Sequence, residues 1–271
     1  MNNLNNLQLR ILVGIFGAIL VLFCIHYHEL GFFGLFLIIG LLTQLEFYKL
    51  LGLDGMFPLK TFGTLTGGLL FAITFFIQKG WAPTDAYYVL FPLLSLSFII
   101  KLYKKELFPF VNVALTYLGL IYVMVPFCLL TVAAFQDGVY NAEIIGASFL
   151  LLWACDTGAY FSGKYFGRRK LFKRISPKKT WEGTLGGAIL TYLMAFGLSF
   201  IYKSFPQIDL YLIASVIIVL GSYGDLVESL FKRSMDIKDS GTSLPGHGGF
   251  LDRFDGLLLA APFILLIIKF F

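Results

Sequence analysis

Charged side chains are concentrated in residues 224–256 of a chain that is otherwise strongly apolar. Two groups of them have the spacing of a helix face. The first group, at i, i+3, i+4 and i+7, consists of Asp225, Glu228, Ser229 and Lys232. The second is the i, i+3 pair of Asp252 and Asp255. Carboxylates brought together repel one another unless a cation lies between them, and hard oxygen ligands suit Mg²⁺. Alternatively, these acids only pair with nearby Lys and Arg residues or line the interface with water.

A second polar region lies between residues 156 and 183. Asp156 stands inside an apolar run, where an ionisable side chain usually contacts a substrate, an ion or a partner. A structural hydrogen bond between helices is the alternative for Asp156. Eight basic residues follow between 164 and 179. The group that best suits a triphosphate combines lysines with hydroxyls and consists of Ser176, Lys178, Lys179 and Thr180. A loop that is merely attracted to anionic headgroups is the plainer interpretation.

A glycine-rich segment separates the two acidic groups and contains His247, Gly248 and Gly249. Glycine lets the backbone approach a ligand closely, so we expect these three residues to contact substrate. A simple turn would explain the glycines equally well. His247 has too few polar companions to be argued as a catalytic base.

Membrane helices must position these residues. The 271-residue chain is 58% hydrophobic and 14% charged, whereas soluble domains carry roughly 25% charged residues. Apolar runs long enough to cross a bilayer recur along the chain, which predicts an all-α, polytopic integral membrane protein with about nine transmembrane helices. The predicted spans are 11–25, 30–50, 61–78, 85–101, 110–134, 145–163, 184–202, 208–224 and 256–271.

The distribution of Lys and Arg supports this count. With the N-terminus in the cytoplasm, 18 of the 21 fall on the cytoplasmic side, and the exceptions are Lys79, Lys203 and Lys269. A missed or false span would scatter the charges over both sides. We therefore expect the charged segment 224–256 to lie on the cytoplasmic side of the membrane. Residues 1–145 would form about five helices, and residues 146–271 a catalytic region of about four helices plus cytoplasmic loops.

The order of these residues resembles the CDP-diacylglycerol synthases, also called phosphatidate cytidylyltransferases. Their C-terminal signature is matched by Ser229, Lys232-Arg233, Lys238-Asp239, Pro245 to Gly249 and Asp252-Arg253-Phe254-Asp255. A second family stretch is matched by Asp156 to Tyr160 and by Ser176 to Gly183. The resemblance covers residues 150–256, while residues 1–145 share only the hydropathy of the family.

The resemblance implies an enzyme of phospholipid biosynthesis that converts CTP and phosphatidate into CDP-diacylglycerol and pyrophosphate and requires Mg²⁺. It also implies a protein of a bacterial-type cytoplasmic (inner) membrane, with its active site open to the cytoplasm. The metal-binding acids of the family correspond to Asp225 and Asp252, with Asp255 close by. Glu228 would orient these ligands or bind a second cation, such as the K⁺ that some members hold. The catalytic residues would then be Asp225 and Asp252, which hold the metal, Asp255, which orients its ligands, and Lys232, and the metal and Lys232 would neutralise phosphate charge. Arg233 and Asp156 would join the groups that contact substrate.

Two other classes of protein remain open at this point. A transporter or channel would explain an intramembrane acid and a cation site, but it predicts repeat-related broken helices that the sequence does not contain. A CDP-alcohol phosphotransferase would also use acids along membrane helices, yet its Asp-Gly-x-x-Ala-Arg pattern is missing. The expected partners are CTP and phosphatidate within the membrane, and no nucleic acid. A homodimer is left open, since small residues such as Gly186-Gly187 allow close helix packing.

Overall fold

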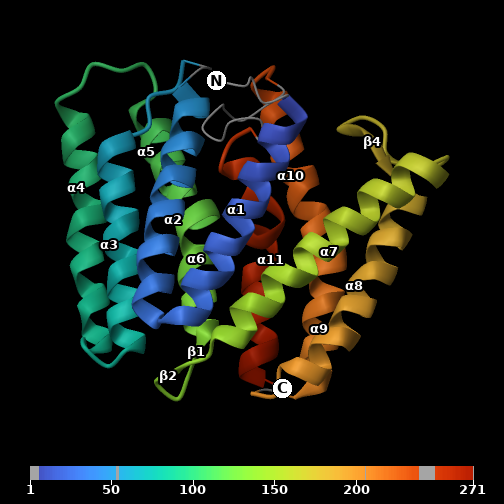
Figure 1. The fold of residues 1–271 in the computed structure, drawn as a ribbon. Helices are drawn as coiled ribbons and strands as arrows, with labels where there is room; N and C mark the ends of the chain where they lie inside the picture. Colours follow the sequence, from blue (N-terminus) through green and yellow to red (C-terminus); the bar gives the residue numbers. More distant parts are fainter. Residues whose placement is uncertain (1–5, 53–54, 205, 238–247, 271) are drawn as a thin grey trace, which may run out of the picture. The chain divides into compact units, whose positions relative to one another are not determined.

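The computed structural model describes residues 6–52, 55–204, 206–237 and 248–270, with side chains from residue 13 onward. Most of these residues are helical (Figure 1). The α-helices are α1 (Asn6–Tyr27), α2 (Glu29–Leu51), α3 (Lys60–Gln78), α4 (Leu90–Leu102), α5 (Pro109–Gly119), α6 (Val125–Ala134), α7 (Ala142–Phe166), α8 (Trp181–Ile201), α9 (Gln207–Val216), α10 (Ser222–Ser234) and α11 (Leu251–Phe270). A 3-10 segment, η2 (Thr84–Val89), precedes α4. Two π-helical segments, η3 (Leu120–Met124) and η4 (Ile217–Gly221), join α5 to α6 and α9 to α10.

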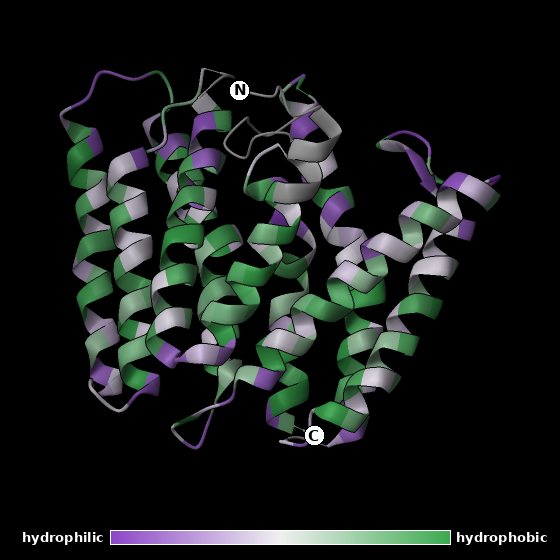
Figure 2. Cartoon of the chain, viewed as in Figure 1, coloured by the Kyte–Doolittle hydropathy of each residue, from purple (hydrophilic) through white to green (hydrophobic). Residues whose placement is uncertain are grey.

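Each predicted span coincides with a helix or a continuous helical run in the described part of the chain. Seven of these runs are long and apolar enough to cross a membrane, and α1 adds the shorter apolar segment Val13–Tyr27. The ninth, α11, has 20 residues and carries charged residues in its first and last turns. Hydrophobic residues cover the middle of the helices and hydrophilic residues gather at their ends (Figure 2). The prediction of an all-α, polytopic membrane protein is therefore confirmed.

Two compact units make up the chain. The first consists of Met1–Val139 with Asp239–Arg253, and the second of Tyr140–Lys238 with Phe254–Phe271. The division passes through α11 between Arg253 and Phe254. Asp252 therefore belongs to the first unit and Asp255, one turn later on the same helix, to the second. A catalytic region confined to residues 146–271 stays a prediction.

In the first unit, α2 packs against α3 and against the α5–η3–α6 run. Tyr48 of α2 is fully buried there, and its hydroxyl donates to the Thr116 carbonyl at 2.6 Å. The Gln44 amide donates to the Tyr48 hydroxyl at 3.0 Å. A buried hydroxyl is stable only when hydrogen-bonded, so this network holds α2 and α5 in one register.

A second polar network in the first unit surrounds Glu106, between α4 and α5. Its carboxylate accepts hydrogen bonds from Lys101 Nζ at 2.5 Å and from Asn112 Nδ2 at 2.6 Å. The buried Lys101 also donates to the Phe57 carbonyl at 2.5 Å. Burial by itself would raise the pKa of Glu106. The hydrogen bonds from Lys101 and Asn112, with the charges of Lys101 and Lys104, outweigh burial and lower that pKa below its usual value.

The lowered pKa of Glu106 predicts a pH-dependent contribution to stability. A carboxyl whose pKa is lower in the folded state stabilises the fold above its unfolded-state pKa of about 4.3, and the contribution is lost as pH falls through the folded value. We expect Glu106→Gln to lower the unfolding free energy by roughly 1–3 kcal/mol at pH 7. The difference from wild type should shrink as pH falls below the unfolded-state pKa of about 4.3, and it should vanish below the lower folded-state pKa, where wild-type Glu106 is neutral too. Thermal melts in detergent at both pH values check this, and a constant difference would contradict it.

In the second unit, α7 and α8 lie side by side along most of their lengths (Figure 1). Glycines make this approach close, because a Cβ atom at Gly158 of α7 would lie 2.6 Å from the Gly186 carbonyl oxygen of α8. A Cβ at Gly187 would lie 2.9 Å from the Cys155 carbonyl oxygen. Gly186 and Gly187 therefore allow close helix packing, and the helix that they pack against is α7 of the same chain.

Short strands appear that the all-α prediction did not include: β1 (Phe135–Gln136) pairs with β2 (Val139–Tyr140), and β3 (Lys170–Phe172) with β4 (Ser176–Thr180). The β3–β4 pair is antiparallel, with Lys170 opposite Thr180 and Phe172 opposite Ser176. Strand pairing satisfies backbone groups that a free loop would leave to water. It also places the predicted phosphate-binding lysines on a hairpin directly before α8.

Candidate active site

The acidic residues of 225–232 lie on α10 as their spacing predicts. The helical run that starts at Gln207 continues past Gly224 to Ser234, ten residues beyond the predicted end of that span. The π-helical segment η4 directly precedes α10, and single-turn π-helical segments frequently occur at functional sites. Asp225, Glu228 and Lys232 thus share one helical face in the second unit.

Three carboxylates of the second unit come together: the oxygen atoms of Asp225, Glu228 and Asp255 lie within 4.8 Å of one another. Glu228 is 1% exposed, while Asp225 and Asp255 are partly exposed. The contact between α10 and α11 depends on Gly224, since a Cβ there would lie 2.4 Å from the Asp255 carbonyl oxygen. Only a residue without a side chain allows the two helices to bring these acids so close.

Two lysines neutralise part of this cluster. Lys179 Nζ lies 2.6 Å from Asp225 Oδ2 and donates to the Ser222 carbonyl at 3.0 Å. Lys232 Nζ lies 2.6 Å from Glu228 Oε2. Lys179 therefore brings the hairpin region, 46 positions before Asp225 in the sequence, to the acidic face of α10. The sequence predicted both lysines in the site but not that Lys179 would contact Asp225.

The other predicted residues of the second unit differ in placement. Asp156 is exposed on α7, and its charge acts on the Asp255 carboxyl, as do those of Asp225 and Lys179. Arg233 is exposed and donates to the Ile237 carbonyl at 3.3 Å. The charge of Asp156 thus acts on the carboxylate cluster. The Arg233 guanidinium instead contacts the backbone just after its own helix ends.

On the hairpin, Ser176 is partly exposed, Lys178 is exposed and Thr180 is buried. The Thr180 hydroxyl oxygen accepts from the Gly183 N–H at 3.2 Å and so caps the N-terminus of α8. The structure gives Thr180 this structural contact, and its role in substrate binding stays a prediction. The exposed Lys178 side chain is accessible to phosphates in solution, whereas the buried Thr180 hydroxyl is occupied by its contact with Gly183.

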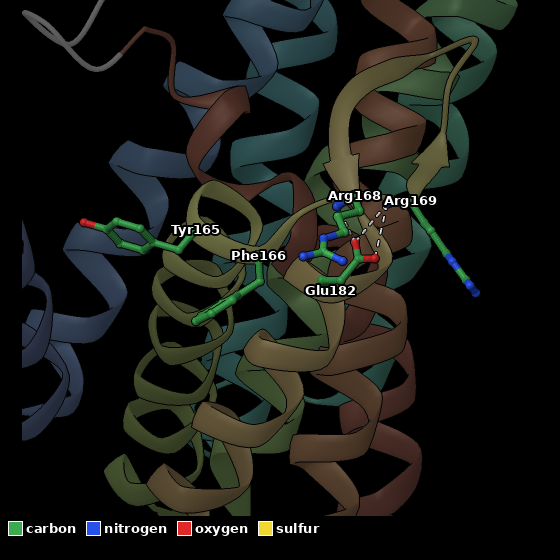
Figure 3. Close-up of a pocket in the computed structure, with 5 residues that line it drawn as sticks. All are labelled: Tyr165, Phe166, Arg168, Arg169 and Glu182. Carbon is green, nitrogen blue, oxygen red and sulfur yellow. Dashed lines mark hydrogen bonds between the residues drawn. The ribbon is translucent and has the colours of Figure 1, made fainter.

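A surface pocket of about 400 Å³ lies nearby, lined by Tyr165, Phe166, Arg168, Arg169 and Glu182 (Figure 3). The Glu182 carboxylate accepts from the backbone N–H of Arg168 at 3.0 Å and of Arg169 at 3.1 Å. Glu182, in the first turn of α8, thus connects the segment just after α7 to the start of α8. The pocket contains none of the predicted site residues, so we place the site at the carboxylate cluster instead.

In the first unit, Gly248 and Gly249 lie against the Asp252 side chain. The Gly249 N–H donates to Asp252 Oδ2 at 3.0 Å. Gly248 has a φ of +84°, a conformation that favours glycine, and a Cβ there would lie 2.7 Å from the same oxygen. His247 lies outside the described residues. The metal-binding role of Asp252 and the substrate contacts of Gly248 and Gly249 stay predictions, since the three-carboxylate cluster is formed by residues of the second unit.

Sequence reasoning missed one acid that contacts the signature region. Glu46 of α2 is 6% exposed, and its carboxylate accepts from the Phe250 N–H at 2.6 Å and from the Leu251 N–H at 3.3 Å. The signal that could have found it is the one applied to Asp156: an ionisable residue inside an apolar span.

A family profile and several known proteins are similar to this chain. The profile of the Cytidylyltransferase family matches residues 8–271. A phosphatidate cytidylyltransferase of Bacillus subtilis (strain 168) is 34% identical over 273 residues, which cover 98% of this chain and 99% of that protein. One of Rickettsia felis is 33% identical over 210 residues, covering 75% of this chain and 90% of the relative. One of Haemophilus influenzae is 43% identical over 137 residues, covering 47% and 46%. The chain belongs to the cytidylyltransferase family.

Proposed function

We propose that this protein is a phosphatidate cytidylyltransferase, which joins CTP to phosphatidate and releases CDP-diacylglycerol and pyrophosphate. The observation that carries the proposal is the cluster of Asp225, Glu228 and Asp255 with its two lysines, in a chain of the cytidylyltransferase family. Membership of that family favours an enzyme over a transporter. The names of the relatives supply phosphatidate as the acceptor.

In the proposed reaction, an oxygen of the lipid phosphate attacks the α-phosphorus of CTP. The bond from that phosphorus to the bridging oxygen of the β-phosphate breaks, and pyrophosphate leaves. The lipid phosphate is itself the nucleophile, so no serine or histidine nucleophile is required. The obstacle is repulsion between two anions, and catalysis is therefore in-line positioning and charge neutralisation.

The acid cluster suits a divalent cation. Three carboxylates whose oxygens lie within 4.8 Å of one another provide the hard oxygen donors that Mg²⁺ prefers. We propose that Asp225, Glu228 and Asp255 hold this ion and that Asp252 contributes a further ligand. Bound there, Mg²⁺ would neutralise phosphate charge at the reacting α-phosphate and on the leaving pyrophosphate. A second cation such as K⁺ in the same cluster is part of the proposal.

The basic side chains are proposed to bind phosphates. Lys179 would exchange its contact with Asp225 for a phosphate oxygen, and the exposed Lys178 would contact the same phosphates with Ser176. Lys232 keeps Glu228 paired and offsets charge beside the reacting groups. Arg233, Asp156 and the Gly248-Gly249 backbone are proposed to complete the binding of CTP and phosphatidate.

We further propose that the site opens to the cytoplasm in a bacterial inner membrane, with a cytoplasmic N-terminus. The 18 Lys and Arg residues on the side of the site, against three on the other, support this orientation. CTP is a cytoplasmic nucleotide, and the acyl chains of phosphatidate require lateral entry from the membrane.

Isotope-labelled CTP tests the proposed function. Purified protein in mixed micelles with phosphatidate and Mg²⁺ should transfer the cytidine label to the organic, lipid phase. Omitting phosphatidate, or chelating Mg²⁺, should abolish the transfer. A transporter would leave the lipid unlabelled, and a CDP-alcohol phosphotransferase would consume CDP-diacylglycerol rather than CTP. Wild-type protein that labels no lipid would refute the proposal.

Lys179 and Lys173 form a matched pair for testing the phosphate-binding role of the hairpin. Removing the Lys179 ammonium takes away a charge-assisted contact, so we expect Lys179→Ala to raise the apparent KM for CTP or phosphatidate about tenfold or more. Lys173→Ala removes an equal charge from an exposed position between β3 and β4 that belongs to none of the proposed site residues, so it should change KM by less than about twofold. Steady-state kinetics with each substrate varied in turn measures both effects. Equal kinetics in the two variants would indicate that the hairpin only attracts anionic headgroups.

A further inference from the structure

The buried carboxylate of Glu46 has a specific partner at the start of α11. Glu46 lies in α2, inside an apolar transmembrane span, where an ionised side chain is costly unless it is hydrogen-bonded or paired. Its Oε2 atom accepts from the N–H groups of Phe250 and Leu251, which are 204 and 205 positions away in the sequence. All three residues belong to the first unit.

The N-terminus of α11 needs such an acceptor. The first N–H groups of a helix have no partner within the helix, and the aligned peptide dipoles place partial positive charge there. Phe250, the residue before Leu251, has no side-chain oxygen that could act as a cap. The Asp252 carboxylate is engaged with the Gly249 N–H. Glu46 therefore supplies from another helix the cap that the local sequence lacks.

Two carboxylates together hold the backbone on either side of this helix start. Asp252 accepts from Gly249, and Glu46 accepts from the next two residues in the chain. The Arg253 N–H donates to the Phe250 carbonyl at 3.0 Å and closes the first turn. The position of Asp252 thus depends on a backbone segment that Glu46 holds in place.

We propose that Glu46 is a positioning residue for Asp252 in cytidylyl transfer: it fixes the N-terminus of α11 so that the Asp252 carboxylate is held for the bound cation and nucleotide. The inference rests on the proposed function. A positioning role for Glu46 differs from a merely structural one, because loss of Glu46 should then change the Mg²⁺ requirement and the turnover of a protein that remains folded.

The test compares Glu46→Ala, Glu46→Gln and Glu29→Ala in the full-length protein. Glu29 is a matched control, because it lies on the same helix and forms an ion pair with Lys79 instead. Hydrogen–deuterium exchange of the peptide that contains Phe250 and Leu251 reports on the cap without any turnover. Thermal melts with and without Mg²⁺ report on cation binding, and labelled-CTP assays give kcat, KM and the half-saturating Mg²⁺ concentration.

In Glu46→Ala, exchange at the two amides should rise at least about tenfold, as expected for the loss of a charge-assisted hydrogen bond. Turnover should fall about 10- to 100-fold, the usual cost of removing a group that orients a metal ligand. The half-saturating Mg²⁺ concentration should rise, and the Mg²⁺-induced increase in Tm should shrink. Glu46→Gln keeps an acceptor oxygen and should recover most of the activity, and Glu29→Ala should match wild type throughout.

Several results would overturn the inference. Unchanged exchange in Glu46→Ala would show that the cap is not formed. Faster exchange with wild-type turnover and Mg²⁺ requirement would show that the cap does not position Asp252, and the proposed function would stand.

If wild-type protein transfers no label, the proposed function fails, and an equal Mg²⁺-induced Tm shift in wild type and Glu46→Ala would then refute the role of Glu46 separately. Should Glu46→Ala fail to fold, Glu46→Gln carries the comparison, because a neutral acceptor should give intermediate exchange and an intermediate Mg²⁺ requirement.

Discussion

Asp225→Asn is expected to lower cytidylyl transfer by at least about 10³-fold, equivalent to about 4 kcal/mol of transition-state stabilisation. Asp225 lies at the centre of the proposed site: its carboxylate belongs to the three-acid cluster and faces Lys179 Nζ at 2.6 Å. Asparagine keeps the size of the side chain but removes its charge. The cluster then loses one anionic ligand, and Lys179 loses the partner that holds it beside α10.

Asp209→Asn is the matched control for this substitution. Asp209 is a buried carboxylate on the same helical run, in the first turn of α9, 16 residues before Asp225. It lies outside the acid cluster, so its asparagine variant should retain turnover. Label transfer from CTP, measured over a series of Mg²⁺ concentrations beside a thermal melt, separates lost chemistry from lost folding. Wild-type turnover in a folded Asp225→Asn protein would remove Asp225 from the site.

Gly224→Ala is expected to abolish most of the activity through packing alone. The new Cβ would lie 2.4 Å from the Asp255 carbonyl oxygen and 2.7 Å from Gly256 Cα. These are backbone atoms, so no side chain can rotate away to make room. The two helices must separate, which moves Asp255 away from Asp225 and Glu228. Overpacking of this kind typically costs about 1–3 kcal/mol of stability.

Gly197→Ala provides the comparison in the same unit. Gly197 lies inside α8, and a Cβ there meets nothing within 4 Å. Alanine in an open helical position should leave stability unchanged or raise it by up to about 1 kcal/mol. Thermal melts in detergent and label transfer should therefore separate the two variants. A Gly224→Ala protein with wild-type Tm and turnover would show that α10 and α11 approach less closely than described.

The parts of the site that depend on neighbouring residues could be predicted from the sequence. The i, i+3 and i+7 spacing placed Asp225, Glu228 and Lys232 on one face, because helical periodicity acts within two turns of a chain. Hydropathy predicted the spans because backbone groups in lipid must be satisfied within each helix. Span ends were less well predicted: the helical run from Gln207 extends to Ser234, since charged residues can continue a helix beyond the apolar core.

Contacts between distant segments could not be predicted in this way. Lys179 reaches Asp225, and Glu46 reaches Phe250, because helices pack in three dimensions and periodicity says nothing about which faces meet. The contact made by Thr180 was not predicted from the sequence either. Hydroxyls beside paired lysines suggested that Thr180 contacts substrate, and that role stays a prediction. The cap that its hydroxyl forms at the start of α8 became visible only in the structure.

The sequence by itself determined the membrane-helix class, the concentration of acids on one helical face and the family resemblance, since each of these is written in local composition and spacing. Tertiary structure alone decided that Asp255 joins Asp225 and Glu228, because that meeting depends on the absence of a side chain at Gly224. It also decided that Glu46 caps α11. Burial makes an unsatisfied carboxylate or helix terminus costly, so folding brings the two together across 204 positions of sequence.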